Sequence, residues 1–439
     1  MDWSFLIKNK PSLHVTTDSR KVTSGSIFVA LKGEHFDGND FVEQAFRQGA
    51  EWVLMEDKEK YNLLPTEYKE RISLPFTGEE LCSIERPVDG RRTLSGVGLL
   101  QDLARAWRRE LKIPIIAITG TNGKTTTKEL TAAVLSKKYK VCYTQGNLNN
   151  QIGVPLTLLS ITRAQEIAIV EMGASHPGDI RELVEIAEPN CGLITNVGKA
   201  HLQGFGSFEG VQKTKAELYD YLCAHNGTIF QNEDNTYLKK MLDDAQKKTV
   251  HCPLSIVHYP TGVMPEGTHL VGAYNAENVS AAMCVGEHFG IAPEEALEAI
   301  RAYVPTNNRS QLMQTERNTL VVDAYNANPT SMQAAIEAFG NVQRSDVRCT
   351  KDCYILGAMR ELGEYSHLEH QNIVNMLLER KADKVLLVGE EYKETTAPYP
   401  VFDNVEALCE ALKKEPVSGY RILLKGSRSN QLEKVIPLL

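Results

Sequence analysis

The chain has 439 residues, of which 42% are hydrophobic and 24% charged, an ordinary globular composition that excludes extended disorder and a fibrous repeat. A typical domain has about 150 residues, so the length predicts roughly three domains. Lys and Arg total 48 against 56 Asp and Glu, a net charge of -8. No general electrostatic attraction for nucleic acid or an anionic membrane follows from this charge, so an anionic ligand needs a local site.

The sequence also gives no indication of a targeting signal or of disulfide bonds. The first residues lack the uninterrupted apolar core of a signal peptide, and no apolar run approaches the about 20 residues needed to cross a bilayer. The nine cysteines include no C-x-x-C pair, so reduced thiols fit better than disulfides or structural zinc. We therefore expect a cytoplasmic protein without membrane insertion.

The first region carries short β-like runs at residues 26–31 and 52–55, with a helix-like stretch at 41–49 between them. They predict a small α/β domain over residues 1–83. Residues 83–112 are charged and helix-prone, and they lead into the apolar run IPIIAIT at 113–119. Such a run is typical of a buried parallel strand.

Two further α/β regions follow. Apolar runs at 140–144, 166–171 and 191–197 alternate with helical patterns, which predicts a mostly parallel, helix-covered sheet over residues 84–309. The rhythm restarts with strand candidates at 320–324, 353–356, 384–388 and 421–424, which predicts a Rossmann-like domain over residues 310–439. The expected fold class is therefore α/β, with three domains.

A candidate phosphate loop follows the strand at 113–119. In such a loop, glycines let backbone N–H groups converge on phosphates, the helix N-terminus adds its dipole, a lysine neutralises charge and a threonine hydroxyl can ligate Mg²⁺. The usual pattern would have glycine at position 118, where this chain has Ile118, and the alternative is an ordinary turn with an exposed lysine. The loop residues are Gly120, Thr121, Asn122, Gly123, Lys124, Thr125 and Thr126.

Five downstream residues are ambiguous when each is taken alone. Glu171 ends a predicted strand at the edge where parallel sheets bind ligands, although such a glutamate is more often simply solvated. His201 follows the next strand in a glycine-rich loop, where a histidine is more often structural than a metal ligand. Lys215 lies in a predicted helix as a surface lysine, and Asn275 and Asn278 fit a capped helix N-terminus.

Together, these residues fall in the order typical of the Mur ligases, and the sequence resembles that family along essentially its whole length. Within the family, GNLNNQIGVP, AHLQGFGS, DAYNANPTSM and the pair GAMRELG with KGSRS resemble the branch that adds D-alanyl-D-alanine. The shorter loop form GTNGKT of this family also accounts for Ile118. The matching segments are TTDSR at 16–20, GSIFVALKGEHFDGNDF at 25–41, TGTNGKTTTKE, GNLNNQIGVP at 146–155, EMGASHPGDI at 171–180, AHLQGFGSFEGV, NAEN, DAYNANPTSM at 323–332 and LKGSRS at 424–429.

The resemblance implies roles in binding ATP and two Mg²⁺ ions. Lys124 and Thr125 would hold the phosphates and Mg²⁺, Glu171 the first metal ion and His201 the second. Lys215 matches a lysine that becomes N-carboxylated in this family, and the resulting carbamate could bind the second ion. Further nucleotide contacts would come from Asn275, Asn278, Arg309 and Asp323. The residues expected to be essential for the reaction are Lys124, Glu171, His201, Lys215, Arg309 and Asp323.

The resemblance also implies substrate contacts in all three regions. The segment matched to the UDP end of the substrate consists of Thr17, Asp18, Ser19 and Arg20. The loop matched to the peptide and reaction centre carries Asn147, Asn149 and Asn150. Candidates for gripping the dipeptide are Asn326, Asn328, Lys425 and Ser427.

The implied reaction is ATP-dependent peptide-bond formation. The terminal carboxylate of UDP-N-acetylmuramoyl-tripeptide would attack the γ-phosphate, and D-alanyl-D-alanine would displace phosphate from the acyl phosphate, with the third domain closing over ATP. The product would be the pentapeptide used in peptidoglycan synthesis, and a monomer is expected. Another Mur-type ligase, including a folylpolyglutamate-like enzyme, and a P-loop ATPase without ligase activity are the alternatives. The sequence leaves open whether the tripeptide ends in diaminopimelate or lysine.

Overall fold

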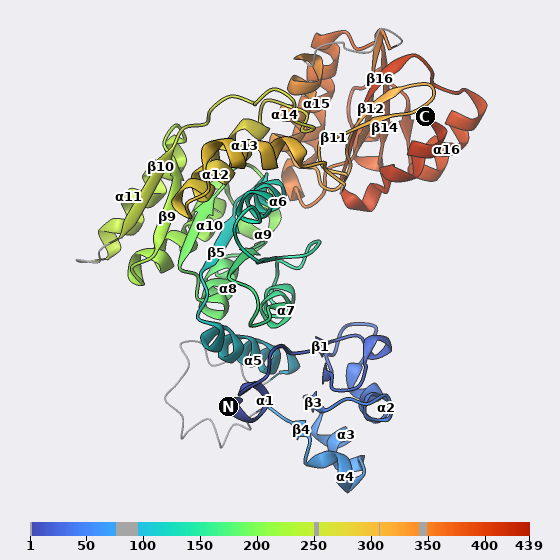
Figure 1. Cartoon of the computed structure of the whole chain (residues 1–439). Coiled ribbons are helices and arrows are strands. Elements are labelled where there is room, and N and C mark those ends of the chain that lie inside the picture. The colour runs from blue at the N-terminus through green and yellow to red at the C-terminus, as the bar shows by residue number, and fades with distance from the viewer. Residues whose placement is uncertain (1, 76–94, 250–253, 307, 342–348) are drawn as a thin grey trace.

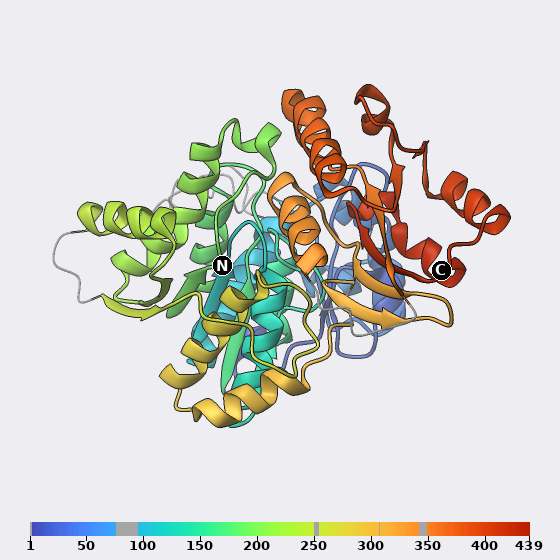
Figure 2. The same cartoon turned by 90° about the horizontal axis from the view of Figure 1, so that it is seen from above.

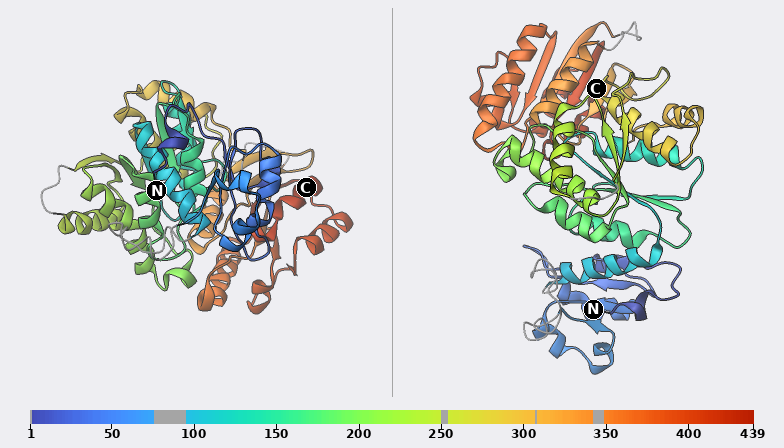
Figure 3. Two further views of the ribbon diagram at one scale, coloured as in Figure 1. Left: turned by 90° about the horizontal axis from the view of Figure 1, so that it is seen from below. Right: turned by 90° about the vertical axis from the view of Figure 1, so that its left-hand side faces the viewer.

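The structure is a computed structural model that describes residues 2–75, 95–249, 254–306, 308–341 and 349–439. In these residues the chain forms three sheets with flanking helices, arranged along one long axis (Figure 1, and Figure 3, right). The expected α/β fold class is confirmed. The predicted domain boundary at 83/84 lies outside the described residues, and the boundary at 309/310 stays a prediction.

The N-terminal sheet has the order β1-β2-β3-β4, and all of its recorded strand pairs are parallel. Because carboxyl ends of parallel strands share one edge, the segment after β1 and the loop after β2 lie at the same edge. The strands are β1 (Val15–Thr16), β2 (Ile27–Val29), β3 (Trp52–Leu54) and β4 (Ile72–Ser73). The helices are α1 (Ser4–Ile7), α2 (Val42–Arg47), α3 (Lys58–Leu63) and α4 (Thr66–Lys69), with 3-10 turns at Ser19–Lys21 and Gly38–Phe41.

The central sheet has the order β10-β9-β8-β5-β7-β6 and is parallel at each recorded pair. Its strands are β5 (Ile115–Thr119), β6 (Val141–Tyr143), β7 (Ile167–Glu171), β8 (Cys191–Ile194), β9 (Thr228–Asn232) and β10 (Ser255–Tyr259). Its helices are α5 (Gly96–Leu111), α6 (Lys124–Leu135), α7 (Gly153–Ser160), α8 (Asp179–Ala187), α9 (Leu202–Phe205), α10 (Phe208–Ala224), α11 (Thr236–Lys248), α12 (Asn275–His288) and α13 (Pro293–Ala302).

Side-chain alternation along β5 explains why helices cover both faces of this sheet. Ile115 and Ala117 enter one buried apolar cluster, with helices α5, α7, α8, α10 and α11. Ile116 and Ile118 enter another, with α6, α12 and α13. Successive side chains of a strand point to opposite faces, so a continuous apolar run needs cover on both. Helix α5 also packs against the N-terminal sheet, because its cluster includes Ile27 and Leu54.

The third sheet has the order β11-β12-β16-β13-β14-β15, antiparallel between β11 and β12 and parallel at the other recorded pairs. The strands are β11 (Gln311–Gln314), β12 (Thr319–Asp323), β13 (Lys351–Gly357), β14 (Lys384–Val388), β15 (Val401–Phe402) and β16 (Tyr420–Lys425). The helices are α14 (Pro329–Asn341), α15 (Ser366–Arg380) and α16 (Val405–Lys414), with 3-10 turns at Gly363–Tyr365, Glu390–Glu394, Arg428–Asn430 and Leu432–Leu438. Viewed from above, α14 lies between the central sheet with its helices and the rest of the third domain (Figure 2).

Two negative expectations concern membranes and disulfides. Among the helices in the described residues, none is long and apolar enough to span a bilayer. Among the cysteines that the structure describes, the free thiols include Cys142, Cys191, Cys284, Cys353 and Cys409.

Candidate active site

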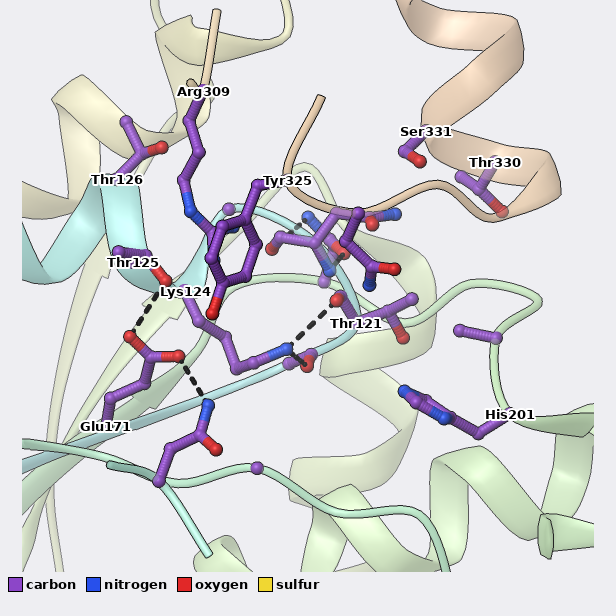
Figure 4. Close-up of a pocket in the computed structure, with 18 of the residues that line it drawn as sticks. Thr121, Lys124, Thr125, Thr126, Glu171, His201, Arg309, Tyr325, Thr330 and Ser331 are labelled. Atoms are coloured by element: carbon purple, nitrogen blue, oxygen red, sulfur yellow. Dashed lines mark hydrogen bonds between the residues drawn. The ribbon is translucent and has the colours of Figure 1, made fainter. Parts of the chain in front are cut away.

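A cavity of about 570 Å³ lies where the carboxyl edge of the central sheet meets the third sheet. Strand β5 lies between β7 and β8, so the segments that follow these three strands converge on one place. The loop after β12 approaches from the third domain, and Figure 4 shows Arg309 and Tyr325 facing the loop that carries Lys124. The cavity therefore joins segments from two of the three sheets.

The loop between β5 and α6 needs glycine at two positions. Gly120 has φ +140° and Gly123 has φ +80°, conformations that side chains rarely adopt. A Cβ at Gly120 would collide with the Thr195 hydroxyl, and one at Gly123 with the Asn278 side chain. Ile118 lies before the loop as a fully buried residue of β5. The loop therefore begins at Gly120 and runs directly into α6.

Lys124 is the first residue of α6 and is held over the loop. Its ammonium donates to the carbonyl oxygens of Gly120 at 2.7 Å and Thr121 at 3.0 Å. Burial lowers the pKa of Lys124 to about 8, while the Glu171 carboxylate opposes that shift. A cation at a helix N-terminus beside backbone N–H groups suits an anionic phosphate chain.

Glu171 ends β7 with its side chain buried and accepts two hydrogen bonds. The Thr125 hydroxyl donates to Oε2 at 2.9 Å, and the Asn149 amide donates to Oε1 at 2.8 Å. Figure 4 shows the contact between Thr125 and Glu171 at the start of α6. The Glu171 carboxylate therefore joins the phosphate loop, the end of β7 and the asparagine-rich segment after β6.

His201 and Lys215 also line this cavity. His201 has φ +49°, immediately before α9, and its Nδ1 contacts the Glu361 carboxylate of the third domain. Burial lowers the pKa of His201, although Glu361 opposes this. Lys215 is 3% exposed, and burial followed by the charge of Lys124 holds its pKa well below the usual range. Lys215 is thus a buried amine on α10, in contrast to a surface lysine.

Asn275 and Asn278 lie at the start of α12, as predicted, but neither caps it. The N-cap residue is Tyr274, and the Asn275 amide donates instead to the carbonyl oxygen of Val271 at 2.8 Å. Asn278 accepts from the Thr127 hydroxyl at 3.0 Å and donates to Asn275 at 2.8 Å. Their buried side chains connect α12 to α6 beside the phosphate loop.

Third-domain residues contribute an aromatic and an ion pair that face the loop. The Arg309 guanidinium lies 3.9 Å from the centre of the Tyr325 ring, a cation–π arrangement. The Lys425 ammonium, 1% exposed, donates to Asp323 at 2.5 Å and to the carbonyl oxygen of Asn326 at 3.3 Å. Lys425 and Asp323, predicted for different ligands, are thus partners of each other.

The structure brings most of the predicted residues into one cavity. The predicted residues outside its lining are Thr17, Asp18, Ser19, Arg20, Asn328 and Ser427. Those that line it are Gly120, Thr121, Asn122, Gly123, Lys124, Thr125, Thr126, Asn147, Asn149, Asn150, Glu171, His201, Lys215, Asn275, Asn278, Arg309, Asp323, Asn326 and Lys425.

The outlying residues have clear local contacts. Asp18 pairs with Arg20 at 2.8 Å at the carboxyl end of β1, and Ser19 is buried. Asn328 lies just before α14, where it accepts from the Ser331 N–H at 2.9 Å and donates to Asn122 of the phosphate loop at 2.8 Å. Ser427 is 4% exposed. The substrate contacts expected of these residues stay predictions.

Sequence reasoning did not identify two tyrosines and an asparagine in the lining. Tyr325 lies two residues after Asp323 in the loop after β12, and Tyr274 shares a 2.6 Å hydrogen bond with Ser310. Asn196, after β8, accepts from the Asn122 N–H at 3.0 Å. Tyr325 and Asn196 could have been predicted, because each follows a strand that ends at this edge. Tyr274 follows no such strand, so the sequence carried no signal for it.

The donor set fits one Mg²⁺ ion more readily than two. Thr125 and Glu171 present adjacent oxygen atoms, the ligand type that Mg²⁺ prefers. In the described part of the chain, no group of three or more His, Cys, Asp and Glu side chains could hold a metal ion. His201 and Lys215 line the same cavity, and a carbamate on Lys215 would add an anionic oxygen ligand for a second ion there.

Comparison with known proteins gives matches over nearly the whole chain. Three family models match: "Mur ligase family, catalytic domain" at residues 13–105, "Mur ligase middle domain" at 118–256 and "Mur ligase, glutamate ligase domain" at 308–428. The UDP-N-acetylmuramoyl-tripeptide--D-alanyl-D-alanine ligase of Bacillus subtilis is 33% identical, over 96% of this chain and 92% of that protein. The ligase of the same name from Escherichia coli is 32% identical, over 97% and 93%.

A solved structure agrees with these matches. The crystal structure of MurF ligase from Thermotoga maritima in complex with ADP has a TM-score of 0.79 and 26% sequence identity, and the match covers 98% of each chain. Family models, relatives and fold thus point to one group of enzymes, which is also the group suggested by the phosphate loop and its neighbours. The chain belongs to the Mur ligase family.

Proposed function

We propose that this protein ligates D-alanyl-D-alanine to UDP-N-acetylmuramoyl-tripeptide, using ATP, and yields the pentapeptide, ADP and phosphate in peptidoglycan synthesis. The observation that carries the proposal is the near full-length identity of about one third to ligases of that name. A cavity between the phosphate loop and the third domain supports it, because ATP and an acceptor amine could meet there.

The reaction proceeds in two displacements. An oxygen of the tripeptide carboxylate attacks the γ-phosphorus of ATP, the bond to the β-phosphate oxygen breaks, and ADP leaves. The dipeptide amine then attacks the acyl carbon, the bond to the phosphate oxygen breaks, and phosphate leaves as the amine loses a proton. Activation as an acyl phosphate supplies the leaving group that a free carboxylate lacks.

Residues around the loop stabilise the transferring phosphoryl group. Lys124 and the N–H groups at the start of α6 face the phosphates and offset developing charge. Mg²⁺, when bound, neutralises phosphate charge, and Thr125 and Glu171 would hold it. Arg309, at the hinge, and Asp323, in the third domain, reach the nucleotide, and docking of that domain aligns the acceptor.

Lys215 serves as an N-carboxylated lysine in this proposal. Carbamate formation joins the ε-nitrogen to the carbon of CO₂ and releases a proton, so it requires the unprotonated amine. Burial lowers the pKa of Lys215, which favours that form. A ¹³C NMR signal for a carbamate, after exposure to ¹³C-labelled CO₂, should appear in the native protein and be missing in Lys215→Met. Equal signals in both proteins would assign the carbamate to another amine.

Remaining aspects of the proposal concern the substrate ends and the setting. Thr17, Asp18, Ser19 and Arg20 bind the UDP end, and the asparagines after β6 face the peptide. The carboxyl edge of the N-terminal sheet, where the first segment lies, is the usual ligand edge of a parallel sheet. We expect a monomer that works in the cytoplasm, where ATP is available.

The test measures phosphate release from ATP and Mg²⁺ in the presence of UDP-N-acetylmuramoyl-tripeptide. D-alanyl-D-alanine, D-glutamate, L-lysine and diaminopimelate are added one at a time, and the product is weighed by mass spectrometry. Phosphate release that occurs only when D-alanyl-D-alanine is the acceptor supports the proposal, provided that the product is the tripeptide extended by one D-alanyl-D-alanine. Release with a single amino acid indicates another Mur-type ligase, and release without any acceptor indicates an ATPase.

A further inference from the structure

Lys128 is a fully buried lysine next to the site, one helical turn after Lys124 on α6. Its ammonium donates to the carbonyl oxygen of Thr144 at 2.6 Å. It also lies 3.1 Å from Glu129 Oε1 and 4.0 Å from Glu171 Oε2. Neither the sequence pattern nor the phosphate-loop chemistry gives this side chain a role.

A buried ammonium is unfavourable unless charges and hydrogen bonds compensate for lost water. The partners of Lys128 meet that requirement, and one of them, Glu171, lines the cavity of the candidate active site. Glu171 is the carboxylate beside Thr125, and Thr144 immediately precedes the segment that carries Asn147 and Asn149.

Thr144 itself is tied to Glu171. The Glu171 N–H donates to the Thr144 hydroxyl at 3.0 Å, and the Thr144 N–H donates to the carbonyl oxygen of Ile169 at 3.0 Å. Lys128 therefore closes a ring of contacts that joins α6, the end of β6 and the end of β7. A shift of its ammonium would move the Glu171 carboxylate and the start of the asparagine segment together.

We propose that Lys128 is a positioning residue, which fixes the Glu171 carboxylate for Mg²⁺ and anchors the asparagine segment that faces the peptide substrate. It rests on the proposed function, because that function gives Glu171 and the segment their ligands. The competing structural role would make Lys128 only a partner of Glu129 that stabilises α6.

The test compares Lys128→Met with Glu129→Gln and with Lys137→Met. Lys137 is a matched control, because it lies just after α6 and pairs with Glu298 on the surface, away from the cavity. Each variant is measured for ATP binding with and without Mg²⁺, for the dependence of phosphate release on Mg²⁺ and tripeptide, and for its melting temperature.

We expect Lys128→Met to weaken the Mg²⁺ enhancement of ATP binding by about tenfold or more, as for residues that orient metal ligands. Its KM for the tripeptide should also rise severalfold, whereas ATP binding without Mg²⁺ stays within about twofold. Glu129→Gln and Lys137→Met should leave both dependences unchanged. Lys128→Gln, which keeps a donor toward Thr144, should recover the tripeptide KM but not the Mg²⁺ effect.

Unchanged Mg²⁺ and tripeptide dependences in a folded Lys128→Met protein would overturn the assignment, as would equal defects in Glu129→Gln. If Lys128→Met does not fold, the Mg²⁺ dependence of ATP binding in Lys128→Gln decides. If neither variant folds, Lys128 is a structural residue, and the assignment is overturned too. The readout of ATP binding needs no acceptor. A native protein that binds MgATP but ignores D-alanyl-D-alanine would therefore refute the proposed function alone.

Discussion

The two sides of the cavity are built differently. On the central side, the loop, Glu171 and Asn149 are joined by hydrogen bonds within one sheet and its connections, such as the 2.9 Å bond from Thr125 to Glu171. The third-domain side reaches the centre through side chains from separate elements. These contacts are Asn328 to Asn122 at 2.8 Å, Lys199 to Glu369 at 2.8 Å, and His201 to Glu361.

We infer from this difference that the central side stabilises charge, whereas the third-domain side aligns the acceptor. Groups that are fixed within one packed domain are ready to stabilise charge before ATP arrives, which is the condition for electrostatic catalysis. We propose that groups which depend on docking between domains control when the acceptor comes into line. Changes on the central side should therefore have larger effects than changes at the docking contacts, and the effects should fall on different kinetic parameters.

The largest effect is expected for Lys124→Met. Loss of a preorganised cation at the phosphates should lower kcat/KM for ATP by about 10²- to 10³-fold, as for other groups that stabilise transition-state charge. Phosphate release under saturating tripeptide and dipeptide measures this. Lys240→Met, on the exposed face of α11, serves as the control and should stay near the native rate. A loss below tenfold in Lys124→Met would erase the distinction between the two sides.

The second prediction concerns pH. Burial lowers the pKa of Lys124 to about 8 in the free protein, and bound phosphates must raise it again. The complex then holds this proton more tightly than the free protein does, so ATP affinity is fully present below pH 8 and is lost as pH rises.

Between pH 7 and pH 9, affinity should fall about tenfold, because one unit above its pKa a group is about nine-tenths deprotonated. Equilibrium ATP titrations without tripeptide measure this central-side property alone. Lys124→Arg keeps its charge throughout the range and should flatten the profile. A native profile without a fall above pH 8 would mean that Lys124 is not the group that titrates.

Sequence alone predicted the central side well for a physical reason. The phosphate loop is one continuous segment, in which strand, glycines, lysine and helix must follow in order. Glu171 could be placed because a strand end in a parallel sheet defines its edge. The buried strands were equally visible, because β5, β7 and the last five residues of β13 are nearly continuous apolar runs.

What the sequence pattern missed depends on contacts between distant segments or on weakly apolar strands. Asn328 meets Asn122 across 206 residues, and nothing local to either predicts that pairing. Strand β11 alternates between half-buried and exposed positions, and β9 ends in the buried polar pair Gln231 and Asn232, so neither resembles an apolar run.

The docking side can be probed with Asn328→Ser. Serine still caps α14 through the Ser331 N–H but is too short to reach Asn122. Loss of one hydrogen bond of about 0.5–1.5 kcal/mol should lower kcat by roughly 2- to 10-fold. Steady-state turnover measures this, and ATP affinity should stay within twofold because the phosphate loop is intact. If ATP affinity falls as much as kcat, Asn328 supports the loop itself, and the two sides are not independent.

The smallest effect is expected for Glu369→Gln. The change removes the carboxylate that pairs with Lys199, whose side chain is 56% exposed and can return to solvent. A pair with one exposed partner contributes about 0–1 kcal/mol, so kcat should fall by less than about fivefold. The native enzyme and the variant should converge between about 0.05 M and 0.5 M salt, because screening removes the same attraction in the native protein. A fall above tenfold that persists at high salt would show that this pair, rather than Asn328, holds the third domain against the central sheet.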